Sequence, residues 1–159
     1  MPNHKEDYHQ RNKNNTAEDY FDEWAEKNNL IFERFGFDQL NSNIQGSDFG
    51  KIPKFIRNRP DYVVIGKKAQ FVEVKGGTDK IRMKQSDLKS YSKWNEEMEL
   101  YYFFYSSRYK THKIIKHEDL LEVLKKCDVG QFHDHTKYDK KLYYKIDWIM
   151  IWRYVESVL

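Results

Sequence analysis

The sequence has little of what many enzyme classes and secreted scaffolds depend on. Cys127 is the only cysteine among its 159 residues, so an internal disulfide is impossible and a reducing compartment is expected. Cys127, His133 and His135 do not suggest a zinc site, because no second cysteine pair or suitably spaced histidine pair accompanies them. The glycines do not form a phosphate-binding fingerprint, and neither a nucleophile elbow nor the kinase motifs occur.

Long apolar runs are also absent. No stretch reaches the ~20 apolar residues needed to span a bilayer, and residues 1–6 lack the apolar run of a signal peptide. Charged residues make up 33% of the chain and aromatic residues 16%, with a mean hydropathy of −0.95. We therefore expect a soluble cytoplasmic protein without a membrane partner, in which residues 1–15 form a flexible tail and residues 16–159 a single domain.

Two short apolar segments, residues 59–65 and 71–77, carry the most informative pattern in the chain. Residues 66–68 between them read Gly-Lys-Lys, a turn signal, so the two segments should pair as neighbouring strands. Asp61 lies on the first segment and Glu73 on the second, with eleven residues between them. The pairing is therefore expected to bring these two acids near each other at one end of a sheet.

A lysine should join the two acids. Glu73 and Lys75 are two residues apart and should point to the same face of their strand, while Val72 and Val74 point to the other. Two close carboxylates raise each other's pKa unless something positive lies between them, and a divalent cation that prefers oxygen ligands is the usual solution. The pattern thus predicts a cation site that includes Asp61.

These residues and their spacing closely resemble the motif of the PD-(D/E)XK nuclease superfamily, including its Holliday-junction-resolvase-like and phage-type members. The resemblance implies an α/β fold, a mixed central β-sheet flanked by α-helices with a restriction-endonuclease-like core. It also implies that Asp61, Glu73 and the Val74 carbonyl bind Mg²⁺ or Mn²⁺ and that Lys75 positions or activates the attacking water. The alternative is an ordinary edge hairpin with a surface Glu–Lys pair of little energetic value.

A helix is expected to begin near Thr16, which can cap it, and to end at Asn28, because apolar residues between them recur at helical spacing. Successive steps of about 100° place Glu18 at the margin of the apolar face. Many members of the resembled superfamily contribute a glutamate from such a helix, so the resemblance implies Glu18 as a further catalytic and metal-binding residue, with Glu23 second. Either could equally be a solvated helix charge.

A second helix is expected over residues 80–97, after the turn at residues 76–79. Gln85 falls on its mostly buried face and must find a hydrogen-bond partner there. The superfamily often places a glutamine or lysine from this helix in the active site, which implies Gln85 or Lys84. In its RecB-like branch a tyrosine follows the glutamine by four residues, whereas Tyr91 follows Gln85 by six. The alternative for Gln85 is a capping or core amide.

Positive charge is concentrated in the middle of the chain. The net charge is +3, but residues 51–93 hold twelve Lys/Arg and four Asp/Glu, a local balance of 12 − 4 = +8. Basic residues on both sides of a candidate metal site indicate phosphate contacts, and we expect a nucleic acid, DNA rather than RNA, as the partner. A solvated basic surface is the alternative. The candidate contacts are Arg57, Arg59, Lys80, Arg82 and Lys84.

The remaining segments complete the expected fold. Residues 30–37 should form the first strand and residues 100–105 a central strand covered on both faces. Residues 38–58 are expected to form a long loop, either around substrate or as a disordered insertion. An amphipathic helix over residues 117–126 and a late strand over 142–146 precede a terminal helix whose aromatic residues suit a core or a dimer surface.

The expected function is a Mg²⁺- or Mn²⁺-dependent endonuclease or structure-selective resolvase acting on DNA. A two-fold homodimer would suit a cutter of duplexes or junctions. Two alternatives stay open: a nucleic-acid-binding or assembly protein that keeps the fold without catalysis, and an interaction module built on the aromatic carboxyl-terminal segment. The intact set of Asp61, Glu73 and Lys75 favours the enzyme.

Overall fold

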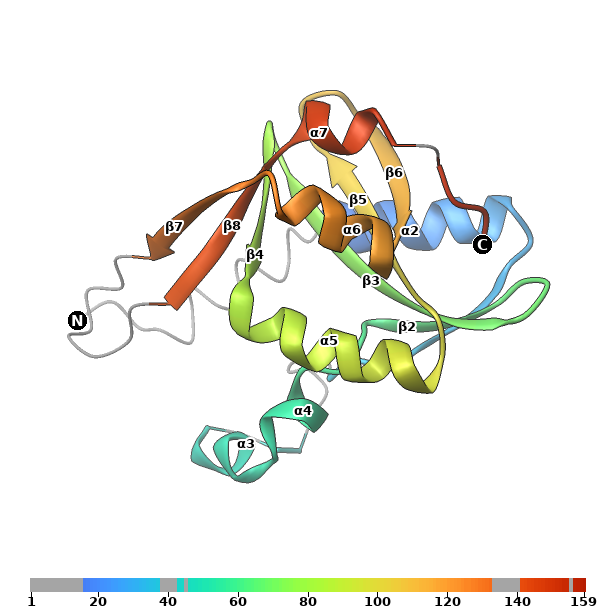
Figure 1. Cartoon of the computed structure of the whole chain (residues 1–159). Helices are drawn as coiled ribbons and strands as arrows, with labels where there is room; N and C mark the ends of the chain where they lie inside the picture. Colours follow the sequence, from blue (N-terminus) through green and yellow to red (C-terminus); the bar gives the residue numbers. More distant parts are fainter. Residues whose placement is uncertain (1–15, 38–42, 45, 133–140, 155) are drawn as a thin grey trace.

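A computed structural model of the chain describes residues 16–37, 43–44, 46–132, 141–154 and 156–159 (Figure 1). The tail expected over residues 1–15 lies outside this range. In chain order the elements are α2 (Thr16–Lys27), β1 (Ile31–Arg34), α3 (Ser47–Lys51), α4 (Lys54–Arg57), β2 (Tyr62–Ile65), β3 (Ala69–Gly77), β4 (Lys80–Lys84), α5 (Gln85–Glu97), β5 (Leu100–Ser106), β6 (Thr111–Lys116), α6 (His117–Leu124), β7 (Asp128–Phe132), β8 (Lys141–Asp147) and α7 (Trp148–Trp152).

The architecture is a mixed α/β fold, which confirms the expected fold class. A five-stranded sheet has the order β1-β2-β3-β5-β6, and a three-stranded sheet has the order β4-β8-β7. Only β3 and β5 run parallel within the larger sheet, and the chain crosses between them through β4 and α5, because a parallel pair cannot be joined by a tight turn. None of the helices in the described ranges is both long and apolar enough to cross a membrane.

The larger sheet is covered on both faces, with α2 behind it and α5 and α6 in front (Figure 1). On the α2 side, Phe21 packs with Phe103 and other apolar side chains of the sheet. On the opposite side, Tyr102 and Phe104 join a second cluster that also includes Ile81 of β4 and Ile146 of β8. Alternate residues of β5 thus enter two cores, and every residue of this strand is buried, as expected for a central strand.

The prediction of a helix over residues 80–97 is wrong for the first five of these residues. Lys80–Lys84 is strand β4, which pairs antiparallel with β8, and helix α5 begins only at Gln85. In β4 the apolar residues Ile81 and Met83 are buried, whereas Lys80, Arg82 and Lys84 are exposed. This alternation of period two is the signature of a half-buried strand, and it determines the structure of the segment.

Several other elements differ from expectation in extent. The loop expected over residues 38–58 contains two short helices, α3 and α4, in its described part. Strands β6 and β7 were not expected at all. The helix expected from Thr16 and the strands expected near residues 30–37 and 142–146 are present as α2, β1 and β8.

We expect Phe103→Ala to lower the free energy of unfolding by about 3–5 kcal/mol, because it leaves a cavity beneath α2. Phe103 is fully buried and contacts the rings of Phe21 and Trp24. Urea denaturation monitored by circular dichroism would measure the loss. Tyr109, which is 56% exposed, is the control, since Tyr109→Ala should change stability by no more than about 0.5 kcal/mol. Equal effects of the two substitutions would contradict the assignment of β5 to the core.

Candidate active site

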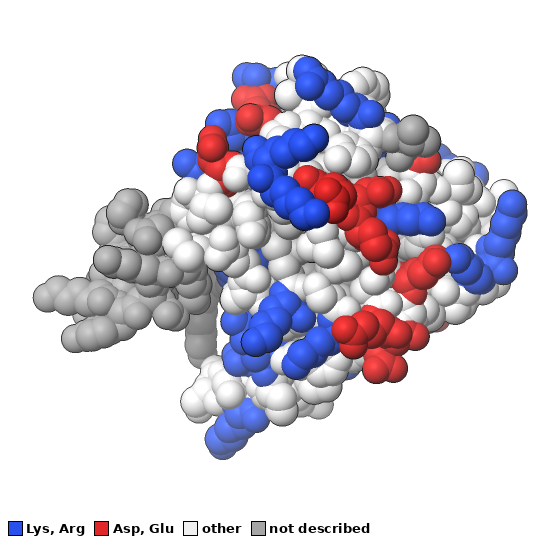
Figure 2. Space-filling view, in the orientation of Figure 1, with Lys and Arg blue, Asp and Glu red and all other residues white. Residues whose placement is uncertain are grey.

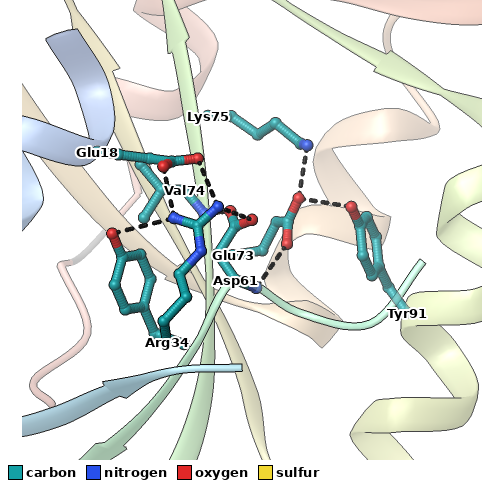
Figure 3. Close-up of polar contacts among 8 residues, drawn as sticks. Glu18, Arg34, Asp61, Glu73, Val74, Lys75 and Tyr91 are labelled. Carbon is teal, nitrogen blue, oxygen red and sulfur yellow. Dashed lines mark hydrogen bonds and ion pairs between the residues drawn. The ribbon is translucent and has the colours of Figure 1, made fainter. Parts of the chain in front are cut away.

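The register of the β2–β3 hairpin places Asp61 and Glu73 together. Tyr62 pairs with Val72 in this antiparallel ladder, so Asp61, which immediately precedes β2, lies beside Glu73. The Asp61 N–H donates to Glu73 Oε2 at 3.2 Å, and the Val74 N–H donates to Asp61 Oδ2 at 2.9 Å (Figure 3). Glu73 is thus held by the backbone of Asp61, and Asp61 is held by the backbone of β3.

Glu73 also collects two side-chain donors. Its side chain is buried, and its Oε1 lies 2.5 Å from Lys75 Nζ and accepts a hydrogen bond of 2.5 Å from Tyr91 Oη (Figure 3). Burial lowers the pKa of Lys75, but the Glu73 and Asp61 carboxylates outweigh this effect, so the pKa of Lys75 lies above its usual value. Lys75 is therefore an ammonium at neutral pH. Tyr91 comes from α5 and joins that helix to the site.

The surroundings of Asp61 destabilise its ionised form. Its side chain is only 17% exposed. Burial raises the pKa of Asp61 well above its usual value, and the Glu73 carboxylate raises it further, whereas Lys75 and the Val74 N–H lower it. A positive charge beside Asp61 relieves this repulsion. That is the electrostatic situation in which proteins bind a cation.

Arg34, which the sequence analysis did not identify, lies on the other side of Asp61. Its Nη1 and Nη2 donate to the two carboxylate oxygens of Glu18 at 2.5 and 3.3 Å, and Nη2 lies 3.8 Å from Asp61 Oδ1 (Figure 3). Glu18 thus faces the sheet from α2, as expected, but its partner in this structure is a guanidinium.

Two glycines allow the backbone to come close enough for this geometry. A Cβ at Gly36 would lie 3.2 Å from the Asp61 Cα, and one at Gly76 would lie 2.8 Å from the Cβ of Ala17. The first contact lets the end of β1 close over Asp61, whose carbonyl accepts the Gly36 N–H at 3.0 Å. The second lets the amino-terminal turn of α2, which carries Glu18, pack directly on β3.

The structure does not bring Gln85 into this cluster. Gln85 is the half-buried first residue of α5, and its side chain makes no hydrogen bond within the described part of the chain. Tyr91, two turns further along the same helix, reaches Glu73 instead. Lys84 precedes the helix and is exposed.

The basic residues expected to contact nucleic acid fall into two groups. Lys80, Arg82 and Lys84 share the exposed face of β4, where Arg82 lies over the ring of Tyr143. Arg57 and Arg59 are half-buried among aromatic rings. Arg59 lies 3.9 Å from the centre of the Phe37 ring, and burial lowers its pKa. The β4 group is therefore the more accessible to a polyanion.

The oxygen atoms at this site suit a hard divalent cation. Among the described residues no three His, Cys, Asp or Glu side chains are grouped as a ready-made metal cluster. Mg²⁺, however, is commonly held by one or two carboxylates and completes its shell with water and substrate oxygens. The Val74 N–H points to Asp61, and the C=O of a strand residue points to the same side as its N–H. Asp61, Glu73 and the Val74 carbonyl thus offer a fitting set.

Comparisons with known proteins add little to this geometry. No protein-family model matches the chain, and no curated protein matches it. Among solved structures, a nuclease from a fusselovirus aligns with a TM-score of 0.43 and 10% sequence identity, over 82% of this chain and 76% of that one. The function of the chain must therefore be inferred from its own residues.

We expect Asp61→Asn to stabilise the protein at pH 7 in the presence of EDTA by roughly 0.5–2 kcal/mol, as relief of functional strain often does. The pKa of Asp61 is higher in the folded chain than the usual 3.8. Its ionisation therefore opposes folding above pH 3.8, and the gain in the variant should shrink as the pH falls toward 4. The asparagine oxygen can still accept the Val74 N–H.

Urea denaturation at a series of pH values would measure this effect. Glu99→Gln is the control, because hydrogen bonds from Lys68 and Tyr101 lower the pKa of that exposed carboxylate. Its neutralisation should bring no gain. A variant Asp61→Asn no more stable than the wild type at pH 7 would show that the carboxylate repulsion is already fully compensated.

Proposed function

We propose that this protein is a metal-dependent nuclease that hydrolyses phosphodiester bonds in DNA. The observation that carries the proposal is the convergence of Asp61, Glu73 and Lys75 at one end of the β2–β3 hairpin. Glu18, Asp61 and Glu73 contribute three carboxylates to the cluster, whereas Arg34 and Lys75 contribute only two cations. One further positive charge can therefore be accommodated, and a cation that binds there would also bind a phosphate. The same three residues form the motif through which the chain resembles the PD-(D/E)XK superfamily, and we propose membership of that superfamily.

The protein side chains would share the work of the reaction. Asp61, Glu73 and the Val74 carbonyl would hold Mg²⁺ or Mn²⁺. Such an ion supplies a Lewis acid that polarises the phosphodiester and lowers the pKa of a bound water. Lys75 would orient that water and stabilise the negative charge that develops on the phosphate. Because the pKa of Lys75 is raised, it would act as a positioned cation and not as the base that accepts the proton.

Tyr91 would position Glu73 in this scheme. Its hydroxyl donates to Glu73 Oε1, and its pKa is raised by burial and by the Glu73 charge, so the phenol stays protonated. Gln85, the first residue of α5, would contact the bound nucleic acid and not the metal ion. Glu18 would add a third carboxylate once freed from Arg34.

The basic side chains are arranged as a polyanion would require. Lys80, Arg82 and Lys84 extend from the strand that follows the site, and Figure 2 shows Lys and Arg side chains gathered over the amino-terminal half of α5. A basic surface of this kind would suit an endonuclease or a resolvase that reads the shape of DNA. Arg57 and Arg59 would contribute from the segment before β2.

A non-catalytic nucleic-acid-binding protein with the same fold is the second candidate. The specific observation in its favour is that Arg34 and Lys75 already sit beside the carboxylates. In that case the acids would be structural, and the basic face of β4 alone would bind nucleic acid.

Cleavage assays would separate the two candidates. We expect Glu73→Gln and Lys75→Met each to lower the rate of metal-dependent DNA cleavage by roughly 100-fold or more, because each removes a group that acts in the transition state. End-labelled single-stranded, duplex, flapped and four-way-junction DNA, with an RNA strand for comparison, would be incubated with Mg²⁺, Mn²⁺ or EDTA. The substrate that is cut fastest would define the preference of the enzyme.

The chain offers a matched control pair. Glu99 and Lys68 form an exposed ion pair on the same sheet, so Glu99→Gln and Lys68→Met repeat the same chemical changes away from the site. Both should cleave as the wild type does. Binding without cleavage in every protein, with no effect of Glu73→Gln on affinity, would favour the binding protein over the nuclease.

The basic face of β4 gives a separate prediction. We expect the double variant Arg82→Ala/Lys84→Ala to bind DNA more weakly and with a smaller dependence on salt, by up to about one unit of slope per lost phosphate contact. Fluorescence anisotropy at several NaCl concentrations would measure it. Lys67→Ala/Lys68→Ala removes the same charge at the far end of the hairpin and should leave the slope unchanged. Equal losses would mean that only net charge matters.

A further inference from the structure

Arg34 is a charged residue beside the candidate site that several contacts hold in place and that the proposed reaction does not use. It ends β1 and pairs with Tyr62 in the antiparallel ladder, so the two side chains share one face of the sheet. The guanidinium donates to Tyr62 Oη at 3.3 Å and lies 5.2 Å from the centre of its ring. Tyr62 is buried, and it therefore fixes Arg34 at the edge of the candidate site.

From this position Arg34 occupies both oxygens of Glu18. The two contacts, at 2.5 and 3.3 Å, come from the two terminal nitrogens of the guanidinium. A fork of this kind is the strongest and most directional pairing that an arginine makes with a carboxylate. Both side chains are largely shielded, with 35% of Arg34 and 24% of Glu18 exposed, so water competes only weakly for the contact.

Glu18 nevertheless lies within reach of the other acids. Arg34 Nη2 bridges it to Asp61 Oδ1, 3.8 Å away, and the Glu18 charge contributes to the raised pKa of Asp61. In Figure 3 the Arg34 guanidinium lies next to both the Glu18 and the Asp61 carboxylate and is joined to each by dashed lines. A positive group thus stands where a shared cation between Glu18 and Asp61 would have to bind.

We propose that Arg34 is a positioning residue that withholds Glu18 from the metal ion in the free protein. The inference rests on the proposed function. With Glu18 held in the fork, the ion has only the donors of Asp61 and the β3 strand, and it binds weakly. When Arg34 releases Glu18, a third carboxylate becomes available and the ion binds tightly.

Charge repulsion between Arg34 and the metal ion must be distinguished from the withholding of Glu18. If the Arg34 charge only repelled the divalent ion, its loss would raise metal affinity even though Glu18 never became a ligand. The two explanations differ in their dependence on Glu18. If Arg34 acts by withholding Glu18, the gain from its removal disappears when Glu18 is neutral, whereas simple repulsion is independent of Glu18. A double-mutant cycle measures this coupling directly.

The experiment is a titration of the full chain with Mn²⁺, in which electron paramagnetic resonance measures free Mn²⁺. We expect Arg34→Gln to tighten Mn²⁺ binding roughly tenfold, a coupling in the usual range for contacting residues. Glu18→Gln alone should change the affinity by less than about twofold, since Glu18 is already occupied in the wild type. The double variant should bind as Glu18→Gln does.

A second substitution at Arg34 tests the same inference in case Arg34→Gln does not fold. Arg34→Lys keeps the charge but loses the fork, so it should tighten Mn²⁺ binding less than Arg34→Gln does, and Glu18→Gln should again abolish the gain. Urea denaturation of each variant would establish that it is folded at the temperature of the titration.

The outcomes distinguish the inference from the function on which it rests. Wild-type binding that is lost in Asp61→Asn, together with no gain in Arg34→Gln or a gain that persists in the double variant, overturns the role of Arg34 and leaves the proposed metal site intact. Failure of the wild type and of every variant to bind Mn²⁺ overturns both.

Discussion

The pairing register of β2 with β3 is the constraint on which the candidate site depends. Side chains alternate along a strand, so a slip by one residue would turn Glu73 and Lys75 toward α2 and bring Val74 to the site. The register is fixed because Val72 and Val74 are buried on the opposite face, in the apolar cluster that also contains Phe21. The apolar core beneath α2 therefore sets the position of the charged cluster, which it contacts through Tyr62 and Arg34.

That charged cluster is costly in the absence of a ligand. Glu73 is almost fully buried, Asp61 is 17% exposed, and the two carboxyl groups lie side by side. Lys75 and Arg34 reduce the repulsion, and Tyr91 donates a second hydrogen bond to the Glu73 oxygen that Lys75 contacts. A protein that only needed this hairpin for stability could replace such a network by apolar residues at little cost. Its presence is consistent with the proposed binding of a cation and a phosphate.

The sequence predicted the centre of this site well and its periphery poorly. Asp61, Glu73 and Lys75 could be placed because a strand of period two and a short turn relate them locally. Arg34 precedes Asp61 by 27 positions, and only the β1–β2 register brings it near. The spacing of Tyr91 from Gln85 is visible in the sequence, but its contact with Glu73 depends on where α5 begins. That boundary was misplaced because Lys80–Lys84 was read at helical spacing, although Ile81 and Met83 alternate with charged residues.

The strand conformation of β4 allows one short segment to serve both the core and the surface. In a helix, the basic residues at positions 80, 82 and 84 would spread around the axis. In β4 they project from one face, while Ile81 and Met83 anchor the other face in the cluster that contains Tyr102. The basic face is thereby attached to the same rigid core that holds the β3 acids. A site built on strands in this way keeps its groups in register more closely than one built on loops. The proposed cleavage would depend on that register, because one nucleic-acid segment would have to meet the acids and the basic face together.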